Sequence, residues 1–282
     1  MIPVLTVEEL SVETNEGPDF QDVGFQLSLG EAAAATSIGP ADLGALLEVL
    51  AGLKRADKGR VSWNRLPAIS ILDDASASAY RRYRILRGLR QSNSYVSPSV
   101  SLLNHLTIYE NIALPLRYHF DPPERVVEER TLRLMDRLKL SEVAGYHPAG
   151  LPLGVVRRAS VARALILEPT ILFLNSPLSA IDNESSDILI SALSHFRNKV
   201  GLTVLAASYE PRTLLSLVTR LFIFSNGKLN HVLQGEELHE SVFFRRMSHL
   251  QGRRREDRNQ TGEAIPEQPG PVQEDENRCV PR

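Results

Sequence analysis

Cysteine is almost absent from the 282-residue chain, in which Cys279 is the only one and stands in a polar stretch. A single cysteine excludes disulfide bonds within the chain and favours a reducing compartment. The first ten residues also lack a basic segment followed by an apolar one, so they predict no export signal. We therefore expect a protein that works in the cytoplasm.

Long apolar runs and an excess of charge are missing as well. The longest apolar stretches, such as Ala45 to Leu53, are interrupted and far shorter than the roughly 20 residues that span a bilayer. The formal net charge of −2 gives no electrostatic case for binding nucleic acid or a bare membrane surface. At a membrane, the protein is expected to act peripherally, on the inner face, by docking on a partner that spans the bilayer.

Signals for a metal site or for hydrolase chemistry are also lacking. The seven histidines have no metal-ligand spacing, and no G-x-S-x-G sequence marks a nucleophilic serine. A solvated helix face explains the one basic run better than a phosphate or lipid-headgroup contact does. This run contains Arg81, Arg82, Arg84, Arg87 and Arg90.

What the chain does contain is the composition and periodicity of an α/β protein. It is 43% hydrophobic and 23% charged, which suits one large domain or two small ones with an ample core. The central stretch, Leu151 to Asp182, predicts a helix over Val155 to Leu167, a buried strand over Ile171 to Leu174 and a polar loop. Nearer the start, a strand over Ala32 to Ile38, a glycine-containing loop and a helix over Leu43 to Leu50 form the layout of a P-loop unit.

The same patterns place the other elements. Further strands are predicted over Leu5 to Leu10, Gly24 to Leu29, Arg60 to Trp63, Tyr95 to Val96, Thr203 to Ala207, Arg220 to Ser225 and Lys228 to Leu233. Further helices are predicted over Ala75 to Arg90, Thr107 to His119, Glu124 to Leu138, Asn183 to Lys199, Glu210 to Leu217 and Ser241 to Leu250. Thr107 and Glu110 have the spacing of a capping box at the start of their helix.

Several motifs now carry a family resemblance. The most specific is Ala162-Arg163-Ala164-Leu165 followed by Glu168-Pro169, with Ser225-Asn226-Gly227-Lys228 as a final hairpin. On these residues the chain resembles the ATP-binding subunit of an ABC transporter over roughly Val4 to Leu250. Two shorter stretches, Asn111 to His119 and Phe243 to Leu250, are most similar to the ATPases of bacterial Mce-type lipid transporters, which implies lipid transport.

The resemblance implies the α/β fold of the ABC-type P-loop NTPases. This fold has a mixed sheet with antiparallel strands at one side and an inserted helical subdomain, here at about residues 98–165. The nucleotide-binding-domain-like region is expected over residues 1–250. Residues 251–282 are polar, with almost no apolar side chains, so we expect a disordered tail.

The phosphate-binding loop departs strongly from the family pattern. A Walker A loop, G-x-x-x-x-G-K-[ST], wraps phosphates with backbone N–H groups and supplies a lysine and a hydroxyl that ligates Mg²⁺. The corresponding stretch here is Gly39, Pro40, Ala41, Asp42, Leu43, Gly44, Ala45 and Leu46. Aligned on the glycines, the lysine becomes Ala45; aligned on Leu50-Ala51-Gly52, it becomes Leu43. In both alignments the cation and the hydroxyl are missing, and Asp42 adds a negative charge.

The other nucleotide positions show the same loss. The Q-loop glutamine falls on Pro98 and the switch histidine on Tyr209. The two acidic positions after the buried strand, which in the family hold Mg²⁺ and activate water, are Asn175 and Ser176. We therefore predict a pseudo-ATPase with no catalytic residue, no metal site and no bound cofactor.

The two motifs that face a second subunit in the family differ from each other. The signature L-S-G-G-x-x-Q begins here with Leu151, Pro152, Leu153 and Gly154. In the family its serine and first glycine bind the γ-phosphate held by the opposite subunit, so Pro152 and Leu153 remove those donors. By contrast, the D-loop pattern is kept in Ser179, Ala180, Ile181 and Asp182.

The resemblance also implies a membrane permease as partner. The expected docking residues lie between the Q-loop and the helical subdomain: Leu102, Leu103, His105, Leu106, Tyr109 and Asn111. The apolar members are equally explained as core residues of the subdomain. The leading hypothesis is an inactive subunit homologue that docks on the permease, as a homodimer or beside another ATP-binding subunit, in a structural or regulatory role.

Two alternatives stay open on the sequence. An active transport ATPase with a divergent site would bind ATP and Mg²⁺ and would need a cation from elsewhere, such as Arg157 or Arg158. A soluble ABC-like regulator would work without a permease.

Overall fold

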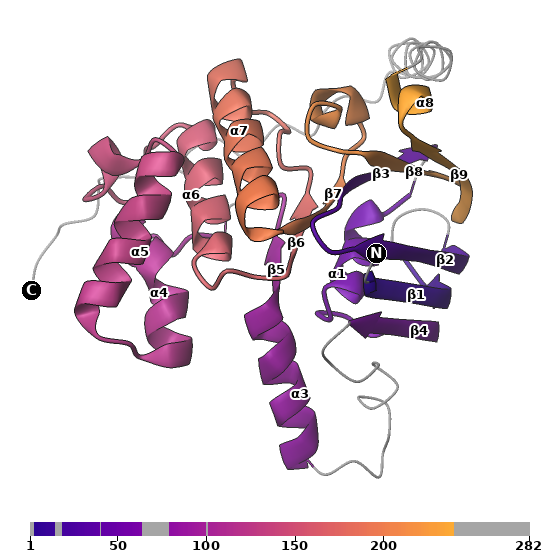
Figure 1. The fold of residues 1–282 in the computed structure, drawn as a ribbon, viewed down its shortest axis with the longest axis horizontal. Coiled ribbons are helices and arrows are strands. Elements are labelled where there is room, and N and C mark those ends of the chain that lie inside the picture. Colours follow the sequence, from indigo (N-terminus) through magenta and orange to yellow (C-terminus); the bar gives the residue numbers. More distant parts are fainter. Residues whose placement is uncertain (1–2, 15–18, 40, 64–78, 100, 240–282) are drawn as a thin grey trace, which may run out of the picture. The chain divides into compact units, whose positions relative to one another are not determined.

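A six-stranded sheet forms the centre of the fold (Figure 1). The computed structural model describes residues 3–14, 19–39, 41–63, 79–99 and 101–239. Five strands of the sheet are parallel and the last pairs antiparallel with its neighbour. Their order is β5 (Asn93–Val96), β6 (Ile171–Asn175), β7 (Thr203–Ala207), β3 (Ala32–Ile38), β8 (Arg220–Ser225) and β9 (Lys228–Gln234). The inner strands are buried on both faces, which is why they read as unbroken apolar runs.

A second, antiparallel sheet holds the strands from the start of the chain. Its order is β2 (Phe20–Ser28), β1 (Pro3–Val12) and β4 (Lys58–Trp63). The sequence predicted a mixed sheet with antiparallel strands at one side. The structure has the mixed six-stranded sheet and places β1, β2 and β4 in an antiparallel sheet of their own. Strand β1 extends beyond the alternating run that predicted it because bulges shift its register, with Glu9 at a φ of 49°.

Helix α1 (Leu43–Leu50) packs against strands of both sheets, β1 on one side and β3, β6 and β7 on the other. Six of its eight residues are buried, and they belong to the main hydrophobic core. At the end of the helix, the indole N–H of Trp63 donates to the Leu50 carbonyl over 3.2 Å. The helix that follows the glycine-containing loop is therefore a core element of the fold.

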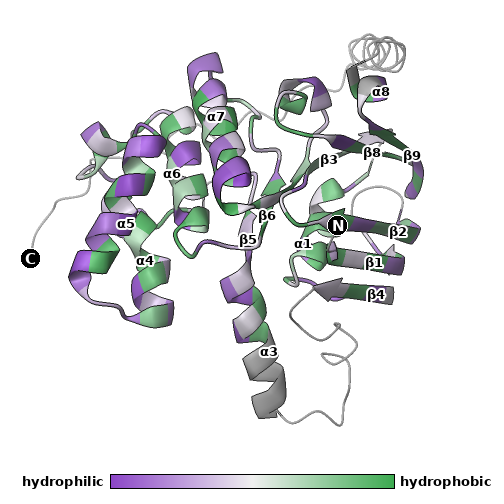
Figure 2. Ribbon diagram, in the orientation of Figure 1, coloured by the Kyte–Doolittle hydropathy of each residue, from purple (hydrophilic) through white to green (hydrophobic). Residues whose placement is uncertain are grey.

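The remaining helices in the described part of the chain comprise a group that lies between β5 and β6 along the chain and three further helices. Between those strands lie α4 (Ile108–Phe120), α5 (Glu124–Arg137), the 3-10 turn η1 (Ser141–Val143) and α6 (Leu153–Leu165). The others are α3 (Ala79–Ser92), α7 (Asn183–Val200) and α8 (Glu236–His239). Figure 2 shows hydrophobic and hydrophilic residues on separate faces of α5 and α7, whereas α6 is buried between its neighbours.

The predicted capping box at the start of α4 is present. The Glu110 N–H donates to the Thr107 hydroxyl over 3.2 Å, and the Thr107 N–H donates to the Glu110 carboxylate over 2.8 Å. These two bonds satisfy donors that a helix start leaves unpaired. The Thr107 hydroxyl in turn donates to the Glu110 carboxylate over 2.9 Å. The bonds that the carboxylate accepts from the Thr107 N–H and hydroxyl lower the pKa of Glu110, because both favour its charged form.

One predicted helix is wrong. Instead of a helix over Glu210 to Leu217, the structure has only a 3-10 turn, η2 (Pro211–Leu214). The Thr213 hydroxyl donates to the Glu210 carbonyl over 2.9 Å, a local bond that competes with helix extension. Some predictions fall outside the described residues: residue Pro40, the helix over Ser241 to Leu250, the tail 251–282 and the side chains of Arg81, Arg82 and Arg84.

Candidate functional site

The segments predicted to bind nucleotide meet at one edge of the six-stranded sheet. Strands β6, β7 and β3 are parallel neighbours, so the residues that follow their carboxyl ends lie at the same edge. These residues are the loop from Gly39 to Asp42, the pair Asn175 and Ser176, and Tyr209. The fold therefore brings these predicted residues to one edge, and their hydrogen bonds define the geometry of that edge.

Asp42 occupies the position where a helix start attracts an anion. Its side chain is the N-cap of α1, and its Oδ1 accepts a hydrogen bond from the Ala45 N–H over 2.9 Å. The free N–H groups and the dipole at a helix N-terminus form the ordinary phosphate site of P-loop proteins. Here the Asp42 carboxylate supplies the negative charge and accepts a hydrogen bond from one of those N–H groups.

The positions of the missing lysine and hydroxyl lie in the hydrophobic core. Leu43 and Leu46 are 1% exposed and Ala45 is 6% exposed, and all three belong to the core cluster around α1. Both candidate alignments of the lysine therefore place it on a buried apolar side chain. Gly39 keeps the left-handed backbone of a tight turn, with a φ of 108°.

Asn175, at the end of β6, lies against the first turn of α1. A Cβ atom on Gly44 would be 2.6 Å from Asn175 Nδ2 and 3.1 Å from Asp42 Oδ1, so a larger residue here would force these side chains to shift. The same Nδ2 donates to the Tyr95 hydroxyl over 3.3 Å, and Asn175 Oδ1 accepts from the Ser176 hydroxyl over 3.3 Å. Burial raises the pKa of Tyr95, so the phenol stays neutral. This neutral cluster stands where the family has two carboxylates.

Tyr209, at the switch-histidine position, ties the loop after β7 to the loop before α1. Its hydroxyl donates to the Ala41 carbonyl over 2.6 Å. The side chain is 48% exposed, so it forms part of the outer wall of this edge. This bond links the segments that follow β7 and precede α1, whereas Asn175 bonds to Tyr95 of β5 and to Ser176.

The Q-loop position is held by an arginine. Arg157, on α6, is 3% exposed, and its guanidinium donates to the carbonyls of Ser97 and Pro98 over 2.8 and 2.6 Å. Burial lowers the pKa of Arg157. Its neighbour Arg158 donates to the carbonyls of Leu138 and Lys139. The two arginines that an active divergent site would need are thus bonded to main-chain oxygens.

The degenerate signature and the D-loop pack on each other. Leu151 precedes Pro152, the N-cap of α6, which offers no side-chain bond, and the 38% exposed Leu153 opens the helix. A Cβ on Gly154 would be 2.2 Å from the Ser185 hydroxyl and 2.5 Å from Asp182 Oδ2. This glycine is therefore kept by close packing of α6 on α7.

The D-loop itself is ordered by hydrogen bonds to its own backbone. The Ser179 N–H donates to the Ser176 carbonyl, and Ala180 has a φ of 58°. Ile181 is half-buried, and Asp182 caps α7 by accepting from the Ser185 N–H over 2.7 Å. That bond lowers the pKa of the Asp182 carboxyl.

Of the six predicted docking residues, four are buried or half-buried and two are exposed. Asn111 is fully buried, and its amide bonds to the main chain of Leu103, Leu106 and Thr107. Leu102 is buried, and Leu106 and Tyr109 are half-buried. Only Leu103 and His105 are exposed. The core interpretation therefore accounts for much of this set.

Sequence reasoning missed two contributors. It placed Tyr95 in a strand but gave it no role, although an aromatic hydroxyl beside the end of β6 is the partner of Asn175. Sequence reasoning also offered Arg157 as a phosphate ligand. In the structure, the Arg157 guanidinium donates hydrogen bonds to the carbonyls of the Q-loop segment. Neither pairing is readable from the sequence, because both join segments about 60 to 80 residues apart.

The arrangement defines an α/β protein with the cassette fold of nucleotide-binding domains. The family model described as ABC transporter matches residues 20–179, more than half of the chain. The chain therefore belongs to the ABC transporter ATP-binding family. Among the described helices, none is long and apolar enough to cross a membrane. The described residues also contain no group of three or more His, Cys, Asp and Glu side chains suited to a metal ion.

Relatives with assigned names are import ATP-binding proteins. The spermidine/putrescine import protein PotA of Hahella chejuensis is 28% identical over 243 residues, covering 84% of this chain and 61% of the relative. The methionine import protein MetN of Clostridioides difficile is 26% identical over 218 residues, covering 77% of this chain and 64% of the relative. The chain thus spans less than two thirds of the length of these relatives.

Solved structures share the fold at low sequence identity. A bacterial ABC transporter cassette solved as a dimer has a TM-score of 0.70 and 18% identity, covering 82% of this chain and 98% of that one. A cassette dimer in a post-hydrolysis state, bound to ADP and phosphate, has a TM-score of 0.69 and 17% identity, with the same coverage. At this identity, the likeness concerns the fold alone.

Proposed function

We propose that this chain is a pseudo-ATPase, a nucleotide-binding-domain homologue that docks on an ABC permease in a structural or regulatory role. One observation carries the proposal: the Asp42 carboxylate caps α1 and takes the Ala45 N–H at the helix start. A phosphate brought to this helix start would meet that carboxylate, and like charges at close range repel. The residues present do not fit Mg²⁺ and ATP.

The energetic loss at this edge supports the same proposal. Hydrogen bonds to charged groups contribute about 1.5–3 kcal/mol each, and removing one oxyanion donor slows a reaction by roughly 10²–10³. Leu43 and Ala45 supply no cation, and Asn175 and Ser176 supply no charged metal ligand or base. Such losses are not additive, but no member of the catalytic set is left.

The proposed role in a transporter complex is argued from the residues that face a second subunit in the family. Gly154 and Asp182 are retained for packing. Pro152 has neither a hydroxyl nor a backbone N–H to offer a partner's phosphate, and Leu153 places a bulky apolar side chain where the family has a glycine. A homodimer, or a heterodimer with a second ATP-binding subunit, would therefore carry at least one weakened composite site. This favours a subunit that holds or regulates a transporter at the cytoplasmic face of the membrane.

The cargo proposed from the sequence is lipid. It rests on the similarity of Asn111 to His119 and Phe243 to Leu250 to Mce-type ATPases alone. The relatives described above are named for the import of polyamines and methionine, so they add no support for a lipid.

Calorimetry with Mg-ATP on the full chain tests the nucleotide part of the proposal. We expect no binding, with PotA of Hahella chejuensis measured in parallel as the positive control. An Asp42→Ser variant keeps a capping hydroxyl and removes the charge, and we expect it to stay without measurable affinity because no lysine is restored. Binding of the unmodified chain in the micromolar range would favour the divergent ATPase instead.

Co-purification from detergent-solubilised membranes tests the docking part. We expect the chain to bring down a membrane subunit, and we expect Leu103→Glu to abolish this because Leu103 is exposed in the predicted docking set. Leu132→Glu, on the exposed face of α5, is the matched control and should have no effect. Recovery of the chain without any membrane subunit would favour a soluble regulator.

A further inference from the structure

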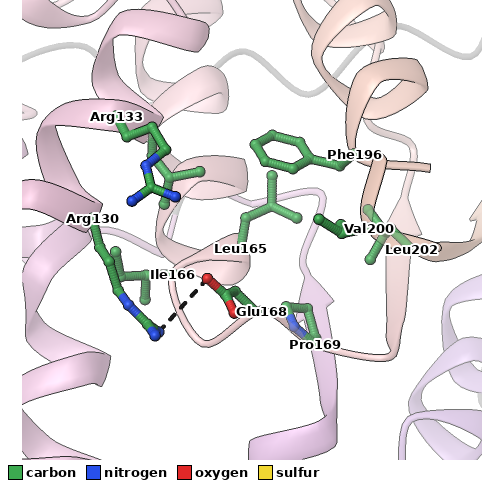
Figure 3. Close-up of a pocket in the computed structure, with 10 residues that line it drawn as sticks. Arg130, Arg133, Leu165, Ile166, Glu168, Pro169, Phe196, Val200 and Leu202 are labelled. Atoms are coloured by element: carbon green, nitrogen blue, oxygen red, sulfur yellow. Dashed lines mark ion pairs between the residues drawn. The ribbon is translucent and has the colours of Figure 1, made fainter. Parts of the chain in front are cut away.

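A hollow of about 250 Å³ lies on the side of α6 away from the site described above. It exists because α5 and α7 both pack against α6 and leave a space between them at the end of α6 (Figure 3). The lining residues come from α5, from the turn after α6 and from the end of α7. They include Arg130, Arg133, Leu165, Glu168, Phe196 and Val200.

The inner wall of this hollow is apolar. Leu165, Ile166 and Leu202 are buried beneath it, and Phe196 of α7 faces Leu165 across it (Figure 3). Val200 at the rim is 68% exposed, so apolar surface continues out to solvent. Apolar hollows with a few polar groups at the mouth are the common form of small-molecule sites.

Two arginines stand at the mouth, and each is ion-paired with one acid, Arg130 with Glu168 and Arg133 with Glu129. Arg130 and Arg133 lie one helical turn apart on α5, and Glu168 is the only acid among the lining residues. Arg130 Nη1 lies 3.7 Å from Glu168 Oε1, longer than a hydrogen bond, and both side chains are partly exposed. Arg133 donates to Glu129 over 3.0 Å on the open side of α5. A guanidinium has five N–H donors, so both arginines keep donors for a further acceptor.

We propose that this hollow binds a small amphipathic anion, with its apolar part against Leu165 and Phe196 and its carboxylate on Arg130 and Arg133. The volume is below the roughly 300–1,000 Å³ of sites for drug-sized ligands, so the ligand is short. A planar carboxylate matches the fork of a guanidinium, whereas an amine would be repelled by both arginines. The ligand touches α5 on one wall and α7 on the other, so binding also ties these helices together. The inference does not depend on the state of the nucleotide site.

Titration of the full chain with sodium octanoate, followed by calorimetry or ligand-observed NMR, tests the proposal. Octanamide and octylamine share the apolar chain and differ in the head group. We expect octanoate to bind at least about tenfold more tightly than octanamide, the factor that one charge-assisted hydrogen bond gives. We expect octylamine to bind more weakly still.

Variants at the exposed rim separate this site from adventitious adsorption. Val200→Asp places a carboxylate at the mouth and should weaken octanoate binding about tenfold or more. Val200→Asn, in which asparagine has the shape of aspartate without its charge, should weaken binding far less. The double variant Arg130→Gln with Arg133→Gln should remove the preference for octanoate over octanamide. Thermal melting checks that each variant is folded. Equal affinities for octanoate and octanamide, the same effect of Asp and Asn at Val200, or no binding tighter than about 1 mM would overturn the proposal.

Discussion

At the scale of single residues, Asp42 determines what the start of α1 can bind. A phosphate loop leaves helix N–H groups open to a ligand, whereas Asp42 closes one of them within the chain. Asn175 bonds the Tyr95 hydroxyl of the neighbouring strand β5, and Tyr209 bonds the Ala41 carbonyl just before α1. These side chains stabilise the fold at the positions where the family resemblance implies chemistry.

The cap role of Asp42 predicts a specific stability pattern. Replacing Asp42 by alanine should lower the free energy of unfolding by about 1 kcal/mol, because an N-cap side chain is lost. Asp42→Ser should cost only a few tenths of that amount, since a hydroxyl also caps a helix. Urea unfolding curves of the three proteins measure the difference. Equal losses for alanine and serine would show that the carboxylate has another role.

At the scale of elements, two arginines of α6 fix the segment after β5. Arg157 binds the carbonyls of Ser97 and Pro98, and Arg163 binds the carbonyl and hydroxyl of Ser101. This segment is the Q-loop of the family resemblance and joins the central sheet to the group α4 to α6. Its attachment to α6 holds the helical group against the sheet.

Arg157→Met tests this attachment, because methionine fills similar space without donors. We expect amide hydrogen exchange around Ser97 and Ser101 to become at least about tenfold faster, as two charge-assisted bonds are lost. Arg197→Met is the matched control, since Arg197 binds the Leu217 carbonyl over 2.7 Å. That variant should speed exchange near Leu217 alone. Unchanged exchange near Ser97 in Arg157→Met would contradict the attachment.

The start of α7 predicts a dependence of stability on pH. Hydrogen bonds from Ser185 lower the pKa of Asp182 below its ordinary value of 3.8. A carboxyl with a lowered folded pKa stabilises the protein above its ordinary pKa, and this contribution is lost as the pH falls through the folded value. Asparagine also caps helices but does not titrate in this range. The melting temperature of the unmodified chain should therefore fall more steeply below about pH 4 than that of Asp182→Asn. Parallel curves for the two proteins would rule out Asp182 as the titrating cap.

At the scale of the whole molecule, the order of elements was readable from the sequence and their long-range pairing was not. Apolar runs such as Thr203 to Ala207 and the capping box at Thr107 follow local rules, and the structure confirms them. The separate sheet of β1, β2 and β4, and the hydrogen bonds of Tyr95 and Arg157, depend on contacts between distant segments. The helix predicted from Glu210 was lost to a local bond of Thr213, which periodicity does not reveal. The roles assigned to Pro98, Ser176 and the docking residues stay predictions.

Reversal of one position tests whether the proposed loss of nucleotide chemistry is coupled to the packing of the fold. Ala45 is buried in the core of α1, so Ala45→Lys would bring an ammonium group among leucines. We expect this variant to be on the order of 3 kcal/mol less stable than the length-matched Ala45→Met, as for an uncompensated buried charge. We also expect it to show no Mg-ATP binding by calorimetry, because Asp42 still caps the helix and Asn175 and Ser176 still replace the acids. Unfolding curves of both variants give the first quantity. A stable Ala45→Lys protein that binds Mg-ATP would contradict this expectation. It would show that the segment before α1 still has room for a phosphate, and that only the side chains of the site differ from those of a working ATPase.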